Sequence, residues 1–249
     1  MEDFNFEIDQ YKSEDNFIAI SPVCVRCNIC YGECPVNAIE SSSIFKTARI
    51  KENCVKCKIC VQSCPISCIN SIDSASVIKP DQEDLGINYS LIKNDLPHRT
   101  LRMKEISIDL SGCTACGYCA EYCPTGAISL EPASFFKDED ITFDEEKTYP
   151  TINKKLCIGC GSCVNLCPED VISLKRYLGP IINTRELVLN QDVCVNCYLC
   201  EENCPVEAIK LEDGNVIIDR DKCIRCNSCS DRCPVAALQI VDLDKEVKK

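Results

Sequence analysis

Apolar positions recur at fixed places along the chain, on both sides of six short segments rich in cysteine. After each segment comes a small or β-branched apolar residue and then Ile or Leu, giving the pairs Ala38-Ile39, Cys68-Ile69, Ala127-Ile128, Val171-Ile172, Ala208-Ile209 and Ala237-Leu238. Four or five positions before the first cysteine of each segment stands one further apolar residue, namely Ile20, Ile50, Ile108, Ile152, Leu189 or Ile218. This repetition predicts an array of similar small units and not one large core.

The stretch 208–219 carries the clearest signal of local structure. Two short β-type segments flank Asp213 and Gly214, and both of these residues tolerate the positive φ of a tight hairpin turn. The residues between the third and fourth cysteines of each segment predict a short helical turn, which the proline after the fourth cysteine ends or redirects. We therefore expect an α+β fold of short hairpins and short helices.

All six segments share the motif Cys-x-x-Cys-x-x-Cys-x-x-x-Cys-Pro, which uses 24 of the 25 cysteines. We number these runs one to six; they are Cys24, Cys27, Cys30 and Cys34; Cys54, Cys57, Cys60 and Cys64; Cys113, Cys116, Cys119 and Cys123; Cys157, Cys160, Cys163 and Cys167; Cys194, Cys197, Cys200 and Cys204; and Cys223, Cys226, Cys229 and Cys233. Thiolates are soft ligands, and this spacing holds [4Fe–4S] clusters. Structural zinc, the alternative, usually takes two separated Cys-x-x-Cys pairs and fits the motif poorly.

The spacing between runs predicts how they pair. The first cysteines of successive runs are 30, 59, 44, 37 and 29 residues apart, so runs one and two form a pair, as do runs five and six. Runs three and four are left as the third pair. We predict an N-terminal extension over 1–17, a first unit over 18–75, a linker over 76–105, a second unit over 106–180 with an acidic insertion at 131–149, and a third unit over 181–249.

Each unit is too small to be stable on apolar packing alone. Domains of about 55 residues are marginal even with an ordinary core, so the clusters must supply much of the interior. We expect the chain without iron to be largely unfolded.

The cysteine content indicates the cellular compartment of the protein. Cysteine makes up 25 of 249 residues, which in a small secreted protein indicates a disulfide scaffold. The odd cysteine count, the regular spacing and an acidic N-terminus without a signal-peptide pattern argue against that class, so we expect the reducing cytoplasm. No apolar run approaches the roughly 20 residues that cross a bilayer, so we expect no direct membrane insertion.

The net charge of the chain indicates which classes of partner it can bind. The formal net charge is -12. Six clusters add roughly −12 more, because a core of charge +2 held by four thiolates carries about −2. Such a chain repels nucleic acid and anionic lipid, favours low reduction potentials and calls for partners with basic docking surfaces.

The runs and their CP-x-x-A-I tails resemble the two-cluster bacterial-type ferredoxin, and three tandem units resemble the polyferredoxins of methanogenic archaea. The resemblance covers about residues 18–242. It implies six [4Fe–4S] clusters and the relay of low-potential electrons by a non-catalytic subunit of a hydrogenase or formylmethanofuran dehydrogenase complex. The six-cluster size and the linker DLPHRTLRMK are similar to the polyferredoxin subunits of energy-converting hydrogenases, which would hold the chain at the cytoplasmic face of the membrane.

The resemblance also implies the ligand sets, because in such units the fourth cysteine of one run binds the cluster of the other run. The six sets are Cys24, Cys27, Cys30 and Cys64; Cys54, Cys57, Cys60 and Cys34; Cys113, Cys116, Cys119 and Cys167; Cys157, Cys160, Cys163 and Cys123; Cys194, Cys197, Cys200 and Cys233; and Cys223, Cys226, Cys229 and Cys204.

Two other functions stay open at this point. The chain could be a freely diffusing multi-electron carrier, or an iron–sulfur subunit with its own substrate site. A single histidine, and the lack of a Gly-x-Gly-x-x-Gly or P-loop motif, favour a role without catalysis.

Several residues outside the motif have a structural and a functional interpretation. Cys68 is expected to be a small buried residue, with a redox or spare-ligand role as the alternative. His98 is expected in a loop. The acidic insertion, with its Phe135, Phe136 and Phe143, reads as a solvated loop or as a contact surface. The N-terminal residues Phe4, Phe6, Ile8, Tyr11 and Phe17 are compatible with a strand, a docking tail or disorder. The tyrosines inside the runs are expected to shield the clusters; they are Tyr31, Tyr118, Tyr122 and Tyr198.

The residue after the second cysteine differs among the runs: it is Asn28, Lys58, Gly117, Gly161, Tyr198 or Asn227. Gly and Asn adopt positive φ readily, whereas Lys and Tyr do so less easily. We hypothesise that the loops at Lys58 and Tyr198 differ from the others in hydrogen bonding and in cluster potential.

Overall fold

The computed structural model describes residues 17–78, 86–91, 97–136 and 141–243, with the backbone alone for 72–78 and 86–91. The N-terminal extension, apart from Phe17, lies outside the described residues, as do residues 137–140 of the acidic insertion. No helix in the described part of the chain combines the length and the apolar character needed to span a membrane.

Every run builds the same local structure. A loop carries the first three cysteines, and a helix of about one turn begins beside the third of them, which confirms the predicted helical turns. These helices are α1 (Ile29–Gly32), α2 (Ile59–Ser63), α3 (Tyr118–Glu121), α4 (Ser162–Leu166), α5 (Leu199–Glu202) and α6 (Ser228–Arg232). Three 3-10 turns, η2 (Leu110–Gly112), η3 (Ala133–Phe136) and η4 (Gln191–Val193), lie between them.

The recurring apolar positions mark the ends of the strands. In six antiparallel pairs, the residue that precedes one run lies opposite the residue that follows the partner run, as in Ile20 opposite Ile69 and Ile209 opposite Ile218. The pairs are β1 (Phe17–Ile20) with β4 (Ile69–Ile78), β2 (Ile39–Glu40) with β3 (Arg49–Ile50), β6 (Leu101–Ile108) with β9 (Ile172–Leu178), β7 (Ile128–Pro132) with β8 (Thr148–Ile152), β10 (Arg185–Leu189) with β13 (Leu238–Asp242), and β11 (Ile209–Glu212) with β12 (Asn215–Ile218). The predicted hairpin turn is confirmed, with Asp213 and Gly214 both at positive φ between β11 and β12.

The strand pairs and helix pairs divide the chain into three lobes. The first lobe holds α1, α2 and β1 to β5, the second lobe holds β6 to β9 with α3 and α4, and the third lobe holds β10 to β13 with α5 and α6. The apolar pairs that follow each run are buried in these lobes except Val171, which is half-buried. Each lobe therefore has a small core of its own between two runs.

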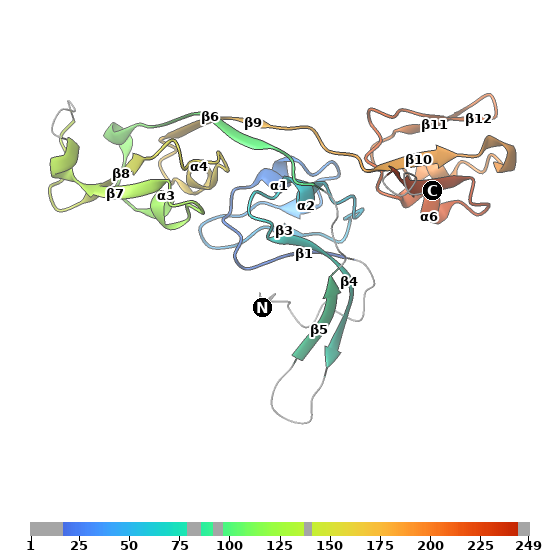
Figure 1. The fold of residues 1–249 in the computed structure, drawn as a ribbon, viewed down its shortest axis with the longest axis horizontal. Helices are drawn as coiled ribbons and strands as arrows, with labels where there is room; N and C mark the ends of the chain where they lie inside the picture. Colours follow the sequence, from blue (N-terminus) through green and yellow to red (C-terminus); the bar gives the residue numbers. More distant parts are fainter. Residues whose placement is uncertain (1–16, 79–85, 92–96, 137–140, 244–249) are drawn as a thin grey trace.

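The segment predicted as a linker contains regular structure. β4 extends to Ile78 and pairs with β5 (Gly86–Leu91), and this arm projects from the first lobe in Figure 1. β6 already begins at Leu101, still inside the 76–105 range. The long separation between runs two and three thus reflects two long strand pairs, which the cysteine spacing did not reveal.

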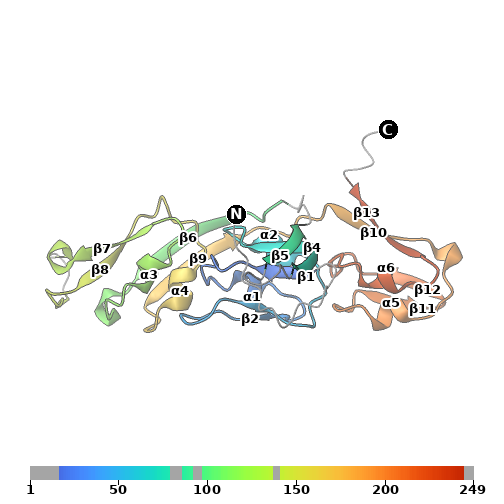
Figure 2. The same ribbon diagram turned by 90° about the horizontal axis from the view of Figure 1, so that it is seen from below.

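The lobes lie in a row with the first lobe in the middle (Figures 1 and 2). The second lobe contacts the first through α4, where Ser162 Oγ donates a hydrogen bond to the Val25 carbonyl and Asn165 Nδ2 donates to the Arg26 carbonyl at 2.8 Å. The Arg26 guanidinium also lies over the Tyr122 ring, 4.4 Å from its centroid. The order of the lobes in space therefore differs from their order in sequence.

The third lobe follows on the other side of the first. In the segment between β9 and β10, the Ile182 N–H donates to Gln62 Oε1 of α2 at 3.1 Å. The side chain of Arg99 contributes to the same region, because its Nε donates to the Gly179 carbonyl at 2.6 Å while its guanidinium pairs with Glu33 of the first lobe. These contacts fix the segments that enter and leave the second lobe against the central one.

Candidate cluster-binding sites

The loop around the second cysteine of every run contains left-handed residues on both sides of that cysteine. In run one they are Arg26, with φ of 59°, and Asn28, with φ of 56°. The corresponding residues of the other runs are Lys56 and Lys58, Ala115 and Gly117, Gly159 and Gly161, Asn196 and Tyr198, and Arg225 and Asn227, all at positive φ. Alternation of this kind turns successive backbone N–H groups toward one side, where they can face an anion.

Lys58 and Tyr198 take the same left-handed conformation as the glycines, with φ of 65° and 63°. This conformation costs a non-glycine residue roughly 1–2 kcal/mol of free energy, so the motif imposes the loop geometry whatever the residue type. The backbone conformation of these two loops is therefore the same as in the glycine loops. The predicted difference in their hydrogen bonding and cluster potential stays a hypothesis.

In five of the six runs the fourth cysteine receives a hydrogen bond from the backbone N–H four residues later. The Ala38 N–H donates to Cys34 Sγ at 3.1 Å, and the Ala208 N–H donates to Cys204 Sγ at the same distance. The same bond joins Cys68 to Cys64 at 3.3 Å, Ala127 to Cys123 at 3.2 Å and Ala237 to Cys233 at 3.2 Å. Such bonds favour negative charge on the sulfur, which is one of the factors that set cluster potentials.

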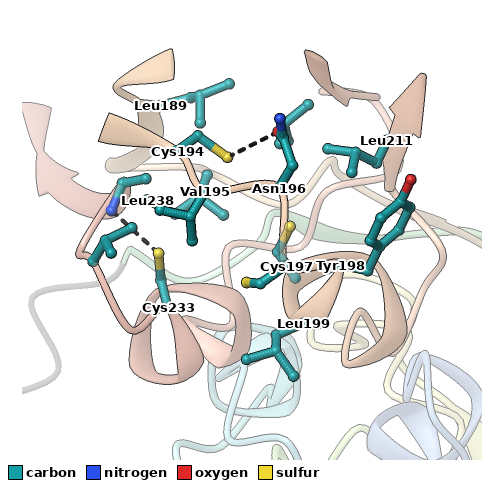
Figure 3. A pocket seen from close by; sticks show the side chains of 14 residues that line it. Leu189, Cys194, Val195, Asn196, Cys197, Tyr198, Leu199, Leu211, Cys233 and Leu238 are labelled. Carbon is teal, nitrogen blue, oxygen red and sulfur yellow. Dashed lines mark hydrogen bonds between the residues drawn. The ribbon is translucent and has the colours of Figure 1, made fainter. Parts of the chain in front are cut away.

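Five cavities in the described part of the chain each bring together the first three cysteines of one run and the fourth cysteine of its partner. Figure 3 shows the cavity with Cys194, Cys197 and Cys233, which Cys200 completes. The other four cavities contain Cys113, Cys116, Cys119 and Cys167; Cys223, Cys226, Cys229 and Cys204; Cys157, Cys160, Cys163 and Cys123; and Cys24, Cys27, Cys30 and Cys64. Their empty volumes of about 310 to 370 Å³ are similar, which indicates one kind of occupant.

The sixth predicted set is also gathered in one place. Cys34 and Cys54 pack against the same buried core of the first lobe. Burial raises the pKa of the Cys60 thiol well above its usual value, and the nearby charges of Cys57, Cys54 and Cys34 add to this shift. Five predicted sets thus line common cavities and the cysteines of the sixth lie near one another, while the ligation of iron by all six sets stays a prediction.

The cavities suit a sulfur-ligated cluster better than a single ion. Their walls are mostly apolar, as with Leu189, Leu211, Val216 and Leu238 around the cavity of Figure 3. Within the described residues no group of three Cys, His, Asp or Glu side chains is placed to hold one metal ion. The four sulfur atoms instead line a common space, as a cluster with iron at four corners requires.

Burial makes the free thiols poor acids. It raises the pKa of Cys30, Cys163 and Cys229 to about 12 in each case, because a thiolate loses solvation in the apolar cavity and is repelled by neighbouring cysteines. Bound iron would stabilise the thiolate form, so loading of these cavities releases protons.

Cys68 lies in the same cavity as four predicted ligands, a contact that sequence reasoning did not find. Its side chain is buried, in agreement with the expectation of a small interior residue, and its Sγ lies 3.4 Å from Cys64 Sγ. The signal in the sequence was the position of Cys68, which stands four residues after the fourth cysteine where the other runs have Ala or Val. Cys68 therefore presents a fifth sulfur to this cavity.

The remaining predicted features lie outside the cavities' sulfur sets. His98 is exposed, with its Nε2 3.1 Å from Ser67 Oγ, as expected for a loop residue. In the acidic insertion, Phe136 and Phe143 pack with Tyr149 near Cys113, so this segment has a small aromatic core and is not simply a solvated loop. Phe135 remains 63% exposed.

Comparison with known proteins gives a consistent picture. Three profiles, each described as a 4Fe-4S dicluster domain, match residues 46–124, residues 112–171 and 156–208, and residues 193–238. Some matches join runs of different lobes, because every run has the same spacing. Similar in sequence is an "uncharacterized polyferredoxin-like protein" of Methanocaldococcus jannaschii, which is 49% identical over 105 residues. That match covers 42% of this chain and 41% of the relative, so the chain spans about two fifths of the relative's length.

Proposed function

We propose that this chain carries six [4Fe–4S] clusters and relays low-potential electrons between redox enzymes. It belongs to the 4Fe–4S dicluster family as a polyferredoxin, with an iron–sulfur electron-transfer role. The observation that carries the proposal is the composition of the cavities, each with three cysteines from one run and the fourth from its partner. A [4Fe–4S] cluster supplies reversible uptake of one electron. The protein's part is to hold four thiolates, donate N–H groups to them and exclude water.

The proposed ligand sets are the six cross-paired sets of the sequence analysis. They are supported by the contacts between α1 and α2, α3 and α4, and α5 and α6, which bring partner runs together. All four sulfur positions of every set are cysteine, so each cluster would be fully ligated and have no open iron for a substrate. This favours electron transfer over catalysis.

We further propose that the chain works within a complex of the hydrogenase or formylmethanofuran dehydrogenase type, in the cytoplasm or at the cytoplasmic face of a membrane. The support is the likeness to polyferredoxins together with a net charge of -12, which suits partners with basic surfaces. Anaerobic purification from the native host, followed by identification of the co-purifying subunits, tests this part. Isolation of the chain alone, with no redox enzyme attached, would contradict it.

The cluster sets can be tested by iron content in single and double variants. The holoprotein should contain about 24 iron atoms, and Cys204→Ser should lose about four, because one cluster holds four iron atoms. Adding Cys226→Ser should cause no further loss if both residues serve the same cluster. Adding Cys197→Ser to Cys204→Ser should instead double the loss, because these cysteines belong to different sets. The opposite pattern would refute the cross-pairing.

A further inference from the structure

The junctions between lobes bring cluster cavities of different lobes face to face. At the junction of the first and second lobes, Asn28 Nδ2 donates to Asn165 Oδ1 at 2.6 Å, directly beside Cys27. Ser162 Oγ donates to the Val25 carbonyl, and Asn165 Nδ2 donates to the Arg26 carbonyl at 2.8 Å, so α4 of run four contacts the loop of run one that carries Cys27. The cavities of runs one and four therefore adjoin at this junction.

The other junction lies between run two and the third lobe. The Ile182 N–H, in the segment that leads into β10 of the third lobe, donates to Gln62 Oε1 of α2 at 3.1 Å. Run two is therefore the part of the first lobe that borders the third lobe.

These junctions define one linear path. Within each lobe two helices pack together and hold their two cavities side by side. Figure 1 shows the lobes in the order second, first, third, so the path runs from runs three and four through runs one and two into the third lobe. The N-terminal lobe is the middle of the path, and its ends are the cavities of runs three and five, whose second cysteines are exposed.

The ends differ from the junctions in exposure. Among the described cysteines, only Cys116 of run three and Cys197 of run five are exposed. Both are second cysteines, whereas the second cysteines of the other four runs, Cys27, Cys57, Cys160 and Cys226, are half-buried or buried. The second-cysteine position is thus open to solvent only in runs three and five among the described residues.

Exposed carboxylates stand close in sequence to Cys197 and Cys116, or line the same cavity. Beside Cys197, Asp192 and Glu202 are exposed, and residues 191–202 include no Lys or Arg. Beside Cys116, Glu121 is exposed and Glu169 lines the cavity. A partner with a basic surface would therefore find complementary charge at either end.

We propose that protein partners exchange electrons with this chain at its two ends, beside Cys116 and Cys197, by placing a basic surface around their own redox centre there. This inference rests on the proposed relay function. Each transfer moves one electron from the donor's reduced centre to the end cluster, or from the end cluster to an oxidised acceptor, and no bond forms or breaks. The first lobe passes electrons between the ends without docking a partner of its own.

The test uses cytochrome c, a basic haem protein, as a probe that accepts electrons from the reduced holoprotein in stopped flow. One variant, Asp192→Lys with Glu202→Lys, reverses the charge at the run-five end, and Glu121→Lys with Glu169→Lys does so at the run-three end. The control, Glu52→Lys with Asp221→Lys, makes the same charge change at exposed residues beside the middle runs two and six.

At low salt each end variant should slow the transfer by about twofold, because one of two docking sites is lost, and their combination should slow it by about tenfold. The middle control should stay near the wild-type rate, and all differences should shrink at high salt. Equal slowing by the middle control, or no slowing by the combined end variant, would overturn the proposal. Iron content and full reduction by dithionite in the same samples test the relay function separately.

Discussion

The first and third lobes contain the same cavity in two settings. The cavity of run one is closed by Cys64, and the cavity of run five is closed by Cys233; both sulfurs accept an N–H from the residue four positions later, at 3.3 and 3.2 Å. The ligand geometry is therefore alike. The surroundings differ, because the cavity of run one adjoins the second lobe, whereas Cys197 of run five is exposed.

The comparison shows that the motif determines the ligand geometry, whereas the neighbouring lobes determine how far a cavity is covered. Burial and nearby cysteines raise the pKa of Cys30 to about 12, and burial also raises the pKa of Cys200. The same desolvation acts on a cluster that takes up an electron, since the added charge is less well solvated in a covered cavity. Exposed end clusters should therefore accept electrons more readily than covered ones, unless hydrogen bonds compensate.

The largest expected contrast comes from removing the closing cysteine of each cavity. Cys233→Ala should lose about four iron atoms, because Ala237 offers no replacement sulfur. Cys64→Ala should keep its cluster in altered form, because Cys68 Sγ lies 3.4 Å from the lost sulfur position. Iron analysis and electron paramagnetic resonance spectra of the two variants measure this.

The matched control is Cys64→Ala combined with Cys68→Ala, which should lose the cluster as Cys233→Ala does. If Cys64→Ala alone already loses about four iron atoms, Cys68 is not a replacement ligand, and the two cavities are equivalent in this respect.

A smaller contrast concerns the left-handed residue after the second cysteine. Asn28 Oδ1 accepts hydrogen bonds from the N–H and the hydroxyl of Ser42, both at 2.8 Å, and its Nδ2 donates to Asn165. Asn28→Ala should therefore destabilise the protein by about 2 kcal/mol. Tyr198→Gly should stabilise the protein by about 1 kcal/mol, because glycine adopts the left-handed conformation without the free-energy cost that it has for the half-exposed tyrosine.

Anaerobic unfolding by denaturant, followed through the cluster absorbance, compares these variants. Asn28→Gly separates the two contributions, because glycine keeps the backbone conformation and loses only the side-chain hydrogen bonds. Equal effects of the Ala and Gly variants at position 28 would assign the whole loss to those bonds. Destabilisation by Tyr198→Gly would show that the tyrosine ring stabilises its cavity.

The repeat could be predicted closely from the sequence because it depends on local spacing. Ile209 and Ile218 were recognisable as equivalent positions, and they lie opposite each other in the hairpin that Asp213 and Gly214 turn. The order of the lobes could not be predicted in this way. It depends on polar contacts such as Asn28 with Asn165, 137 residues apart, and exposed asparagines of this kind carry no distinctive pattern.

The strand pairs β4–β5 and β6–β9 were missed for a related reason. β5 and most of β6 lie inside the range 76–105 that the cysteine spacing predicted as a linker, and this part of β6 carries the charged residues Arg102, Lys104 and Glu105. The role of Cys68 required a distance, because composition alone identifies it only as a small residue that packs well. Sequence thus predicts the ligand sets through resemblance, and the structure adds the neighbours of each set.

The smallest contrast is a shift in potential caused by one hydrogen bond. With Cys64 bound to iron as a thiolate, only the Cys68 S–H can donate across the 3.4 Å between the two sulfurs. Its hydrogen bonds to Cys24 and Cys64 hold the pKa of Cys68 well above the usual thiol value, so it keeps its proton. Cys68→Ala should therefore make the reduction of this cluster less favourable by about 1 kcal/mol, which lowers its potential by roughly 40 mV for one electron.

Ala237→Cys provides the converse change, because it introduces a thiol at the matching position beside Cys233 and should raise the potential of the run-five cluster by a similar amount. Cys68→Ser, which keeps a donor, should recover part of the loss seen in Cys68→Ala. Potentiometric titration monitored by electron paramagnetic resonance resolves the shift of one cluster among six. If Cys68→Ala leaves every potential unchanged while Ala237→Cys raises one, the native thiol does not donate to its neighbour, and the covered cavity owes its potential to burial alone.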